Sequence, residues 1–329
     1  EDLRDPPGRT RVAFPWDQTA AGRPPGPVAD RTLDYGAECS PDDIDAGRCP
    51  LTDLLGHGTH IAGTAAGDGS ATGAGQPAYR YTGIAPAADL IIVRGGDGTY
   101  TTDRVVDGVA YILDRAARLG RPAVVNLSLT TQSGPHDGTT LFERALAALA
   151  GPGRILVSAA GNQGTNRNER PPFPRAPIHA MGALATGGRS EHALVVPPYV
   201  PNPGAANDGA VLELWYEGED SLTVTLVSPR GHELRVATGD SALASTPGGT
   251  IYVANAPGGP QAINGDHACL IVLFDADAAT PPDSGRWRIV VEGRAVRGPG
   301  TYHLWLTGAT FRAGTETAYL DGGVTNTHL

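Results

Sequence analysis

The sequence contains no lysine: all 25 basic residues are arginine. A phosphate-binding Walker loop needs a lysine directly after its glycines, so the glycine-rich segments 67–75 and 95–98 do not predict nucleotide binding. A net charge of −10 without a basic cluster argues against nucleic acid as a partner. No apolar run approaches the roughly 20 residues of a membrane-spanning helix, and the first residues do not form a signal-peptide pattern.

Methionine and cysteine are also scarce. Met181 is the single methionine and the chain begins with Glu1, so we expect the parent protein to have residues upstream of this sequence. Cys39 and Cys49 enclose a polar loop and can close a small disulfide. A metal site at this pair is less favoured, because no further Cys or His lies nearby at ligand spacing. Cys269 lies in an apolar run and is predicted to be a buried thiol, and an extracellular compartment fits this cysteine usage without being required.

The first half of the chain alternates apolar strand patterns with helical ones. Residues 1–56 are rich in Pro, Gly and Asp and predict a surface loop excursion with one short strand at 12–14. The alternation that follows predicts an α/β fold, a parallel sheet covered by helices on both faces. Ser128 and Asn162 fall at or just past strand ends, where such sheets gather their site residues. The expected elements are a helix over 57–66, a strand over 90–93, a helix over 103–119, a strand over 123–129, a helix over 140–150 and a strand over 155–160.

Beyond the proline-rich segment 171–174 the hydrophobic period changes to two. Apolar and polar residues alternate in several short segments, and no helical pattern is found among them. This pattern predicts an inserted antiparallel β-sandwich or jelly roll over about 177–307. We therefore expect an α/β domain over 1–176, the β domain, and a return to the first domain over 308–329.

Two motifs carry the chemistry. Residues 56–64 read Gly-His-Gly-Thr-His-Ile-Ala-Gly-Thr, and residues 158–164 read Ser-Ala-Ala-Gly-Asn-Gln-Gly. Together they resemble the histidine and oxyanion-asparagine blocks of the subtilisin-like serine proteases, the subtilase (S8-type) family. The resemblance implies a subtilisin-like parallel sheet and a serine endopeptidase that hydrolyses polypeptide substrates through a Ser/His/Asp triad. It assigns His57 as the general base and Asn162 as the side-chain donor to the oxyanion.

Other interpretations of these residues are weaker. A zinc-protease helix spaces its histidines four apart with a Glu between them, whereas His57 and His60 are three apart without one. We expect His60 to be a structural histidine packed below the site. Asn162 alone would be interpreted as a turn residue, but it lies two residues after the end of a predicted strand, in the family's order.

The segment 125–129, Val-Asn-Leu-Ser-Leu, resembles the strand with which subtilases pair the substrate backbone. The family continues with two glycines, whereas this chain has Thr130 and Thr131, which would narrow the first specificity pocket. Asn126 begins a glycosylation sequon, but a strand this apolar is expected to be buried and the sequon is discounted. The residues that the resemblance assigns to substrate binding are Ser128, Leu129, Thr130, Ala160 and Gly161.

Two members of the triad are not found in the sequence. Residues 1–5 resemble the segment that follows the family's acid block, and the sequence ends before a Gly-Thr-Ser nucleophile block. We expect a fragment of an active enzyme, with the acid, the nucleophile and any propeptide outside this chain. The alternative is a pseudoprotease with a binding or regulatory role. The β insertion resembles that of Csp-type germination proteases, which implies a secreted or spore-associated protein.

No cofactor is required by this chemistry. Subtilases sometimes hold calcium in surface loops, and residues 42–45, Asp-Asp-Ile-Asp, are the candidate segment for such a site. A solvated acidic turn is the favoured interpretation of these residues.

Overall fold

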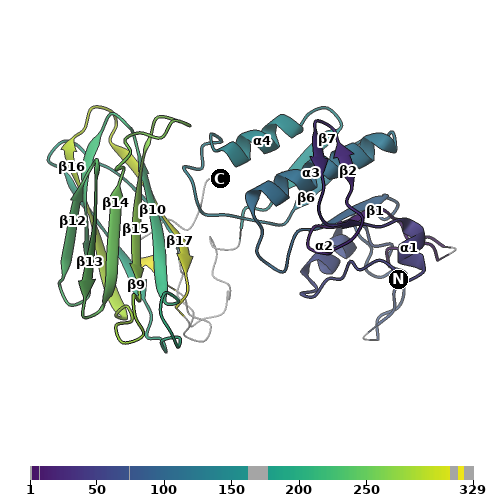
Figure 1. Cartoon of the computed structure of the whole chain (residues 1–329), viewed down its shortest axis with the longest axis horizontal. Helices are drawn as coiled ribbons and strands as arrows, with labels where there is room; N and C mark the ends of the chain where they lie inside the picture. Colours follow the sequence, from purple (N-terminus) through teal and green to yellow (C-terminus); the bar gives the residue numbers. More distant parts are fainter. Residues whose placement is uncertain (1, 7, 74, 162–176, 312–317, 322–329) are drawn as a thin grey trace. The chain divides into compact units, whose positions relative to one another are not determined.

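The computed structural model describes residues 2–6, 8–73, 75–161, 177–311 and 318–321. The chain forms two compact units (Figure 1). The first unit combines residues 1–128 with 141–159, and the second combines 129–140 with 160–329. Among the described residues, none of the helices has the length and apolar character that crossing a bilayer requires.

Strands of the first unit form two separate sheets with parallel pairing. One has the order β4-β1-β5, in which β1 and β5 are parallel, and the other is the parallel pair β6-β7. A continuous parallel sheet was expected, but in the described part of this unit β5 and β6 are not hydrogen-bonded to one another. The strands are β1 (Val12–Asp17), β2 (Gly26–Val28), β3 (Arg31–Leu33), β4 (Ala37–Glu38), β5 (Leu90–Arg94), β6 (Ala123–Leu127) and β7 (Arg154–Ser158).

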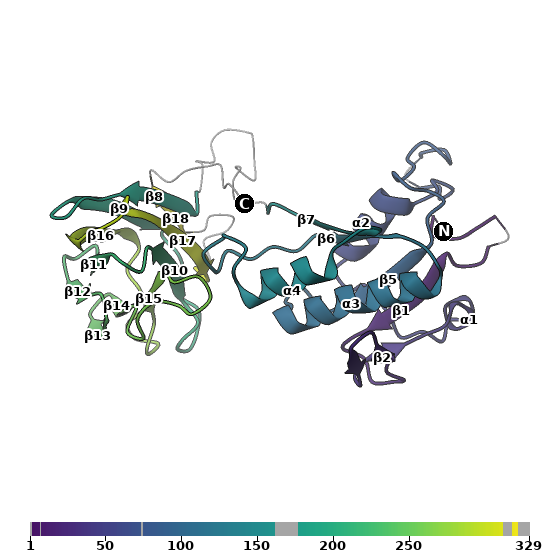
Figure 2. The same cartoon turned by 90° about the horizontal axis from the view of Figure 1, so that it is seen from above.

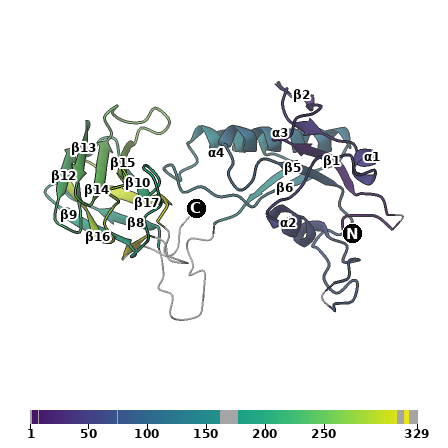
Figure 3. The same ribbon diagram turned by 60° about the horizontal axis from the view of Figure 1, so that its bottom comes forward.

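Helices lie on both sides of the strands of this unit. In Figure 3, α3 and α4 lie on one side and α2 on the other. Helix α3 packs on both sheets: its Tyr111 belongs to one hydrophobic cluster with Trp16, and its Val109 belongs to another with Val125. Apolar residues recur along this helix every three to four positions and form a stripe on one side of it. This stripe faces both clusters, which is why the sequence pattern predicts the helix. The helices are α1 (Pro41–Asp45), α2 (His57–Ala66), α3 (Thr102–Arg118) and α4 (Leu141–Leu149).

The predicted strand at 12–14 is confirmed as the start of β1, but the strand is longer and buried, so the interpretation of residues 1–56 as mostly a surface loop is wrong. Trp16 of β1 is fully buried against the rings of Tyr35 and Tyr111. Pro15 obscured the strand, but its carbonyl accepts a hydrogen bond from the Cys39 amide at 3.1 Å. The N–H and C=O of a strand residue point to the same side, so the side of Pro15 that lacks an N–H faces β4. Strand β4 pairs with only the last two residues of β1, so the proline is tolerated in this strand.

The second unit consists of two antiparallel sheets around one hydrophobic core. Their orders are β13-β14-β15-β10-β17-β8 and β12-β11-β16-β9-β18. Figure 2 shows the strands of the two sheets from above. The strands are β8 (His179–Ala183), β9 (Arg189–Val196), β10 (Gly209–Tyr216), β11 (Ser221–Val227), β12 (Glu233–Ala237), β13 (Asp240–Thr246), β14 (Gly249–Asn255), β15 (His267–Phe274), β16 (Gly285–Ala295), β17 (Thr301–Ala309) and β18 (Tyr319–Asp321).

A buried asparagine links the two sheets of this unit. Asn255 of β14 donates its side-chain amide to the carbonyl of Leu222 at 3.1 Å and to that of Val236 at 3.3 Å. Its side-chain oxygen accepts the hydroxyl of Tyr216 at 2.8 Å. The side chain is fully buried, and these bonds satisfy its polar atoms, as a buried amide requires.

The predicted return of residues 308–329 to the first domain is wrong for the residues described there. Strand β18 pairs with β9 of the second unit, and Leu320 is fully buried in its core. The boundary near residue 176 also differs, because residues 129–140 belong to the second unit. A three-residue strand that pairs with a partner more than a hundred residues away gives no local signal.

The cysteine predictions are confirmed. Cys39 and Cys49 form a disulfide with a Cα–Cα distance of 5.8 Å. Cys269 is a free thiol on β15 within the core of the second unit, and burial raises its pKa.

Candidate active site

Helix α2 begins at His57, as the motif predicts, and a carboxylate organises its start. Gly56, directly before it, is left-handed with φ 77° and offers no side chain for a cap. Instead Asp53 accepts the backbone amide of Thr59 at 2.7 Å, that of Gly56 at 2.8 Å and that of Leu55 at 3.1 Å. A helix N-terminus leaves its first amides without partners, so Asp53 satisfies one of them.

Sequence reasoning missed Asp53. These hydrogen bonds, led by the one from the Thr59 backbone, lower the pKa of Asp53 to about 2. The carboxylate is therefore ionised at neutral pH, and its charge favours the positive end of the helix. The capping pattern of a sequence is an Asp or similar residue immediately before the helix, a position that Gly56 occupies here, so this pattern does not find Asp53.

The other end of α2 is fixed by tight backbone packing. The amides of Gly83 and Ala85 donate to the carbonyls of Gly67 and Ala65 at 2.7 and 2.8 Å. A Cβ on Gly83 would lie 2.6 Å from the Gly67 nitrogen, so only glycine fits there. The Gly-Ile-Ala-Pro segment that begins at Gly83 thus fixes the end of the helix opposite to His57.

Most of the α2 surface is not covered by the described residues. Ala66 is its single buried residue, and the side chains of His57 and His60 are both exposed. The packed structural position that we expected for His60 is therefore not seen in this chain. An exposed imidazole at His57 is accessible to another group.

The strand ends expected to bind substrate lie at one edge of the β6-β7 pair. The Ala159 amide donates to the carbonyl of Leu127 at 3.0 Å, so the two strands end together. Ser128 follows β6 directly, and its hydroxyl accepts the side-chain amide of Asn126 at 2.9 Å. Ala160 follows β7 and is exposed, and Gly161 has φ 86°.

The remaining site residues divide between the second unit and the undescribed part. Leu129 and Thr130 belong to the second unit, and Thr130 is exposed. Asn162 lies outside the described residues. Its approach to His57 therefore stays a prediction.

One face of the β6-β7 pair is uncovered among the described residues. Val124, Ile155 and Val157 are 69%, 54% and 48% exposed, and Val124 lies opposite Ile155 in the register. The expectation that this strand is buried is confirmed for the face of Val125 and wrong for the other face, which α3 and α4 do not cover. Asn126 is exposed on the uncovered face, so burial does not exclude the glycosylation sequon.

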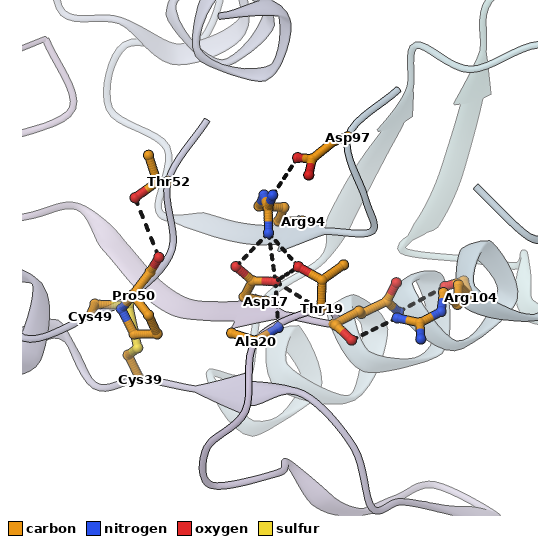
Figure 4. A network of polar contacts seen from close by, with 11 residues as sticks. Asp17, Thr19, Ala20, Cys39, Cys49, Pro50, Thr52, Arg94, Asp97 and Arg104 are labelled. Atoms are coloured by element: carbon orange, nitrogen blue, oxygen red, sulfur yellow. Dashed lines mark hydrogen bonds and ion pairs between the residues drawn. A yellow bond between two sulfur atoms is a disulfide. The ribbon is translucent and has the colours of Figure 1, made fainter. Parts of the chain in front are cut away.

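A buried aspartate lies at the carboxyl end of β1 (Figure 4). Asp17 accepts the amide and the hydroxyl of Thr19 at 2.8 and 2.7 Å, and Arg94, opposite it on β5, forms an ion pair with it at 2.9 Å. Burial alone would raise the pKa of Asp17, but the hydrogen bonds from Thr19 and Arg94 outweigh it and hold the pKa below the usual value. The carboxylate of Asp17 is thus engaged by Thr19 and Arg94 and is not free to orient an imidazole. Sequence reasoning missed this network.

The candidate calcium segment is engaged by arginines. Asp43 forms a capping box with Ser40 at the start of α1 and an ion pair with Arg48 at 2.9 Å. Arginines 9 and 4 pair with the other two carboxylates of the segment. No group of three or more candidate metal ligands is found among the described residues.

Comparison with known proteins identifies the family. The model of the subtilase family (Peptidase_S8) matches residues 29–250, more than half of the chain. The chain therefore belongs to the subtilase family.

Several proteins that match the chain are subtilisins or subtilisin-like proteases. The chain is 33% identical over 143 residues to the subtilisin of Bacillus sp. (strain TA39), covering 43% of this chain and 31% of that protein. It is 34% identical over 182 residues to subtilisin-like protease 9 of Arthroderma benhamiae, covering 53% and 39%. The structure of the Clostridium perfringens CspB protease matches its fold with a TM-score of 0.72 at 21% identity, covering 94% of this chain and 61% of that one. The chain thus spans about a third of the length of these two relatives and less than two thirds of the solved structure.

Proposed function

We propose that this chain is the part of a subtilisin-like serine endopeptidase that carries its general base and its oxyanion donor. The observation that carries the proposal is His57, exposed at the first turn of a helix whose start Asp53 fixes, in a chain of the subtilase family. His57 would take the proton of a serine hydroxyl and return it to the leaving amine. The side-chain amide of Asn162 would donate to the developing oxyanion.

The triad acid would enter on a strand between β5 and β6. In the described part of the first unit, β5 pairs only with β1 and β6 only with β7, so each has an unpaired edge. Helix α3 packs on both strands, through Val93 of β5 and Val125 of β6. A strand inserted there would pair with both edges, and its carboxyl end would carry the acid to the sheet edge where Ser128 lies.

The nucleophile would come with a segment that covers the uncovered faces. Exposed apolar side chains at Val124, Ile155 and Val157 form a patch that a monomeric soluble protein rarely leaves open. The outer surface of α2 is uncovered in the same way. A helix carrying the serine would bury both and bring its hydroxyl to His57.

The substrate would pair as an extended strand beside the end of β6. Backbone pairing of this kind supplies affinity, and pockets for alternate side chains supply specificity. Ser128, Leu129 and Thr130 would line one side and Ala160 and Gly161 the other. Thr130 and Thr131 would narrow the first pocket, which favours small side chains there. We also propose that the strands of the second unit are connected as in a jelly roll. The protein would be secreted or spore-associated.

The complete parent protein tests this function. A fluorophosphonate, which labels activated serines covalently, should label it, and His57→Ala should abolish both labelling and peptide hydrolysis while the melting temperature stays unchanged. Asn162→Ala should lower kcat by about 10²–10³-fold. The 329 residues alone should neither be labelled nor hydrolyse casein. A parent protein that binds peptide but is not labelled would instead be a pseudoprotease.

A further inference from the structure

A fully buried tryptophan of the second unit lies outside its core. On β17 the alternating side chains of Leu304 and Leu306 point into the core between the two sheets. Trp305 therefore points to the outer face of the six-stranded sheet, yet it is only 2% exposed. Some other part of the chain must cover it there.

Two histidines cover Trp305. The ring of His179, on the neighbouring strand β8, stacks on it at 3.8 Å between centroids with an interplanar angle of 13°. The ring of His136 lies 4.1 Å from it. His136 belongs to residues 129–140, so this segment lies on the outer face of the sheet.

Hydrogen bonds hold the same segment at two further points. The Gly134 amide donates to a carboxylate oxygen of Glu213 on β10 at 2.9 Å, and the Trp215 indole donates to that oxygen at 3.0 Å. The side-chain amide of Asn264 donates to Asp137 at 3.0 Å. These contacts fall at Gly134, His136 and Asp137, so the middle of the segment is anchored at several neighbouring points.

The anchored segment begins with residues that were assigned to substrate binding. Leu129 and Thr130 are its first two residues. The segment ends at Thr140, where α4 of the first unit follows at Leu141. Any freedom of residues 131–140 would therefore be transmitted through the backbone to the substrate-binding residues.

We propose that Trp305, His136 and Glu213 are positioning residues, which hold the segment 129–140 on the β-sheet and thereby fix Leu129 and Thr130 for binding of the peptide substrate. This inference rests on the proposed endopeptidase function. The strands β10 and β17 of the second unit then have a part in substrate recognition without touching the substrate.

Hydrogen exchange of the 329-residue chain tests the anchoring without any enzyme activity. Trp305→Ala and His136→Ala should each raise exchange of the 131–139 amides at least about tenfold, while amides of β10 stay protected. Trp305→Phe, which keeps a ring for stacking, should restore most of the protection. Leu243→Ala, at an exposed position of β13 in the same sheet, is the matched control and should change nothing. Unchanged exchange in both alanine variants would overturn the anchoring.

Kinetics of the complete protein test the positioning. Trp305→Ala and His136→Ala should raise KM for a peptide substrate about tenfold and change kcat less than about threefold, and Trp305→Phe should restore KM. An unchanged KM in variants whose segment exchanges faster would overturn the positioning role. If the unmodified protein hydrolyses nothing, the proposed function fails, and hydrogen exchange still decides whether the anchor exists.

Discussion

The carboxylate of Asp53 accepts the backbone amide of Thr59 at 2.7 Å and so fixes the first turn of the helix that begins at His57. The candidate general base therefore depends on a residue four positions before it. Glycine at position 56 lets the chain turn into the helix but cannot cap it. The family motif contains the histidine and its glycines, whereas the capping group lies just outside it.

Removing this cap should loosen the helix start. In Asp53→Ala the amides of Gly56 and Thr59, which Asp53 accepts, should exchange faster, while Asp53→Asn, which keeps an oxygen acceptor, should change them less. In the complete protein, Asp53→Ala should lower kcat/KM because the imidazole of His57 is less well placed. Equal exchange at these amides in Asp53→Ala and the unmodified chain would contradict the capping role.

The pH dependence of this cap has a defined sign. The pKa of Asp53 is about 2 in the folded chain, below the ordinary value of 3.8. A lowered carboxyl pKa means that its stabilisation is fully present above about pH 4 and is lost as the pH falls towards 2. Protection of the Thr59 amide should therefore be constant from neutral pH to about pH 4 and decrease below it. Asp53→Ala should remove this decrease.

Acidification should also release the segment 129–140 from the sheet, at a higher pH than the one at which the Asp53 cap is lost. Burial first, and then the charges of His303 and His136, lower the pKa of His179 to about 4, and burial lowers that of His303. His179 Nε2 lies 3.0 Å from His303 Nδ1, and its other ring nitrogen is buried without a partner among the described residues. Protonation would therefore place an unpaired charged donor against Trp305. The carboxylate of Glu213, opposite Trp305 on β10, already accepts hydrogen bonds from the Gly134 amide and the Trp215 indole.

These histidines destabilise the fold when the pH falls, whereas a histidine with an acidic partner, whose pKa is raised, destabilises it when the pH rises. The neutral histidines stabilise the fold fully above about pH 6.5, and this stabilisation is lost as the pH falls from there towards 4. Exchange of the 131–139 amides, corrected for its intrinsic pH dependence, should increase over that range. His179→Phe keeps a ring against Trp305 without a titrating group and should flatten the profile. A profile identical to that of the unmodified chain would contradict the assignment.

The network at the end of β1 should contribute to stability through its buried pair. Asp17→Ala leaves Arg94 without its buried partner and should lower the free energy of unfolding by about 3 kcal/mol. Asp97, the other partner of Arg94, is about half exposed, so Asp97→Ala should cost less than about 1 kcal/mol. Urea denaturation followed by circular dichroism measures both. Equal losses in the two variants would show that burial does not set the strength of these pairs.

Local patterns predicted the elements of the first unit that have a strong period. Helix α3 was placed within one residue at each end, because its apolar stripe repeats over several turns and Gly120 follows it. The start of α2 came from the family motif. Strand β1 was underestimated because Pro15 and a bulge between Val12 and Phe14 interrupt its alternation.

Contacts between residues far apart in the chain could not be predicted from the sequence. The position of β18 depends on β9, and the burial of Trp305 depends on His136, which is more than a hundred residues away. Neither contact has a local signal. Of the candidate site, the motif predicted that a helix begins at His57, whereas Asp53 reaches the helix from three residues before its N-cap, where no capping pattern applies.

The single disulfide gives a last test, because the chain has only three cysteines. Cys39 and Cys49 close a loop with a sequence separation of 10, which should stabilise the fold by about 3 kcal/mol. Replacing both by serine should lower the free energy of unfolding by that amount, whereas Cys39→Ser alone should add one reactive thiol. Thiol labelling of the folded chain should find none, since Cys269 is buried and its pKa is raised, and labelling in denaturant should find one. More than one thiol in denaturant without reductant would show that the two cysteines are unpaired.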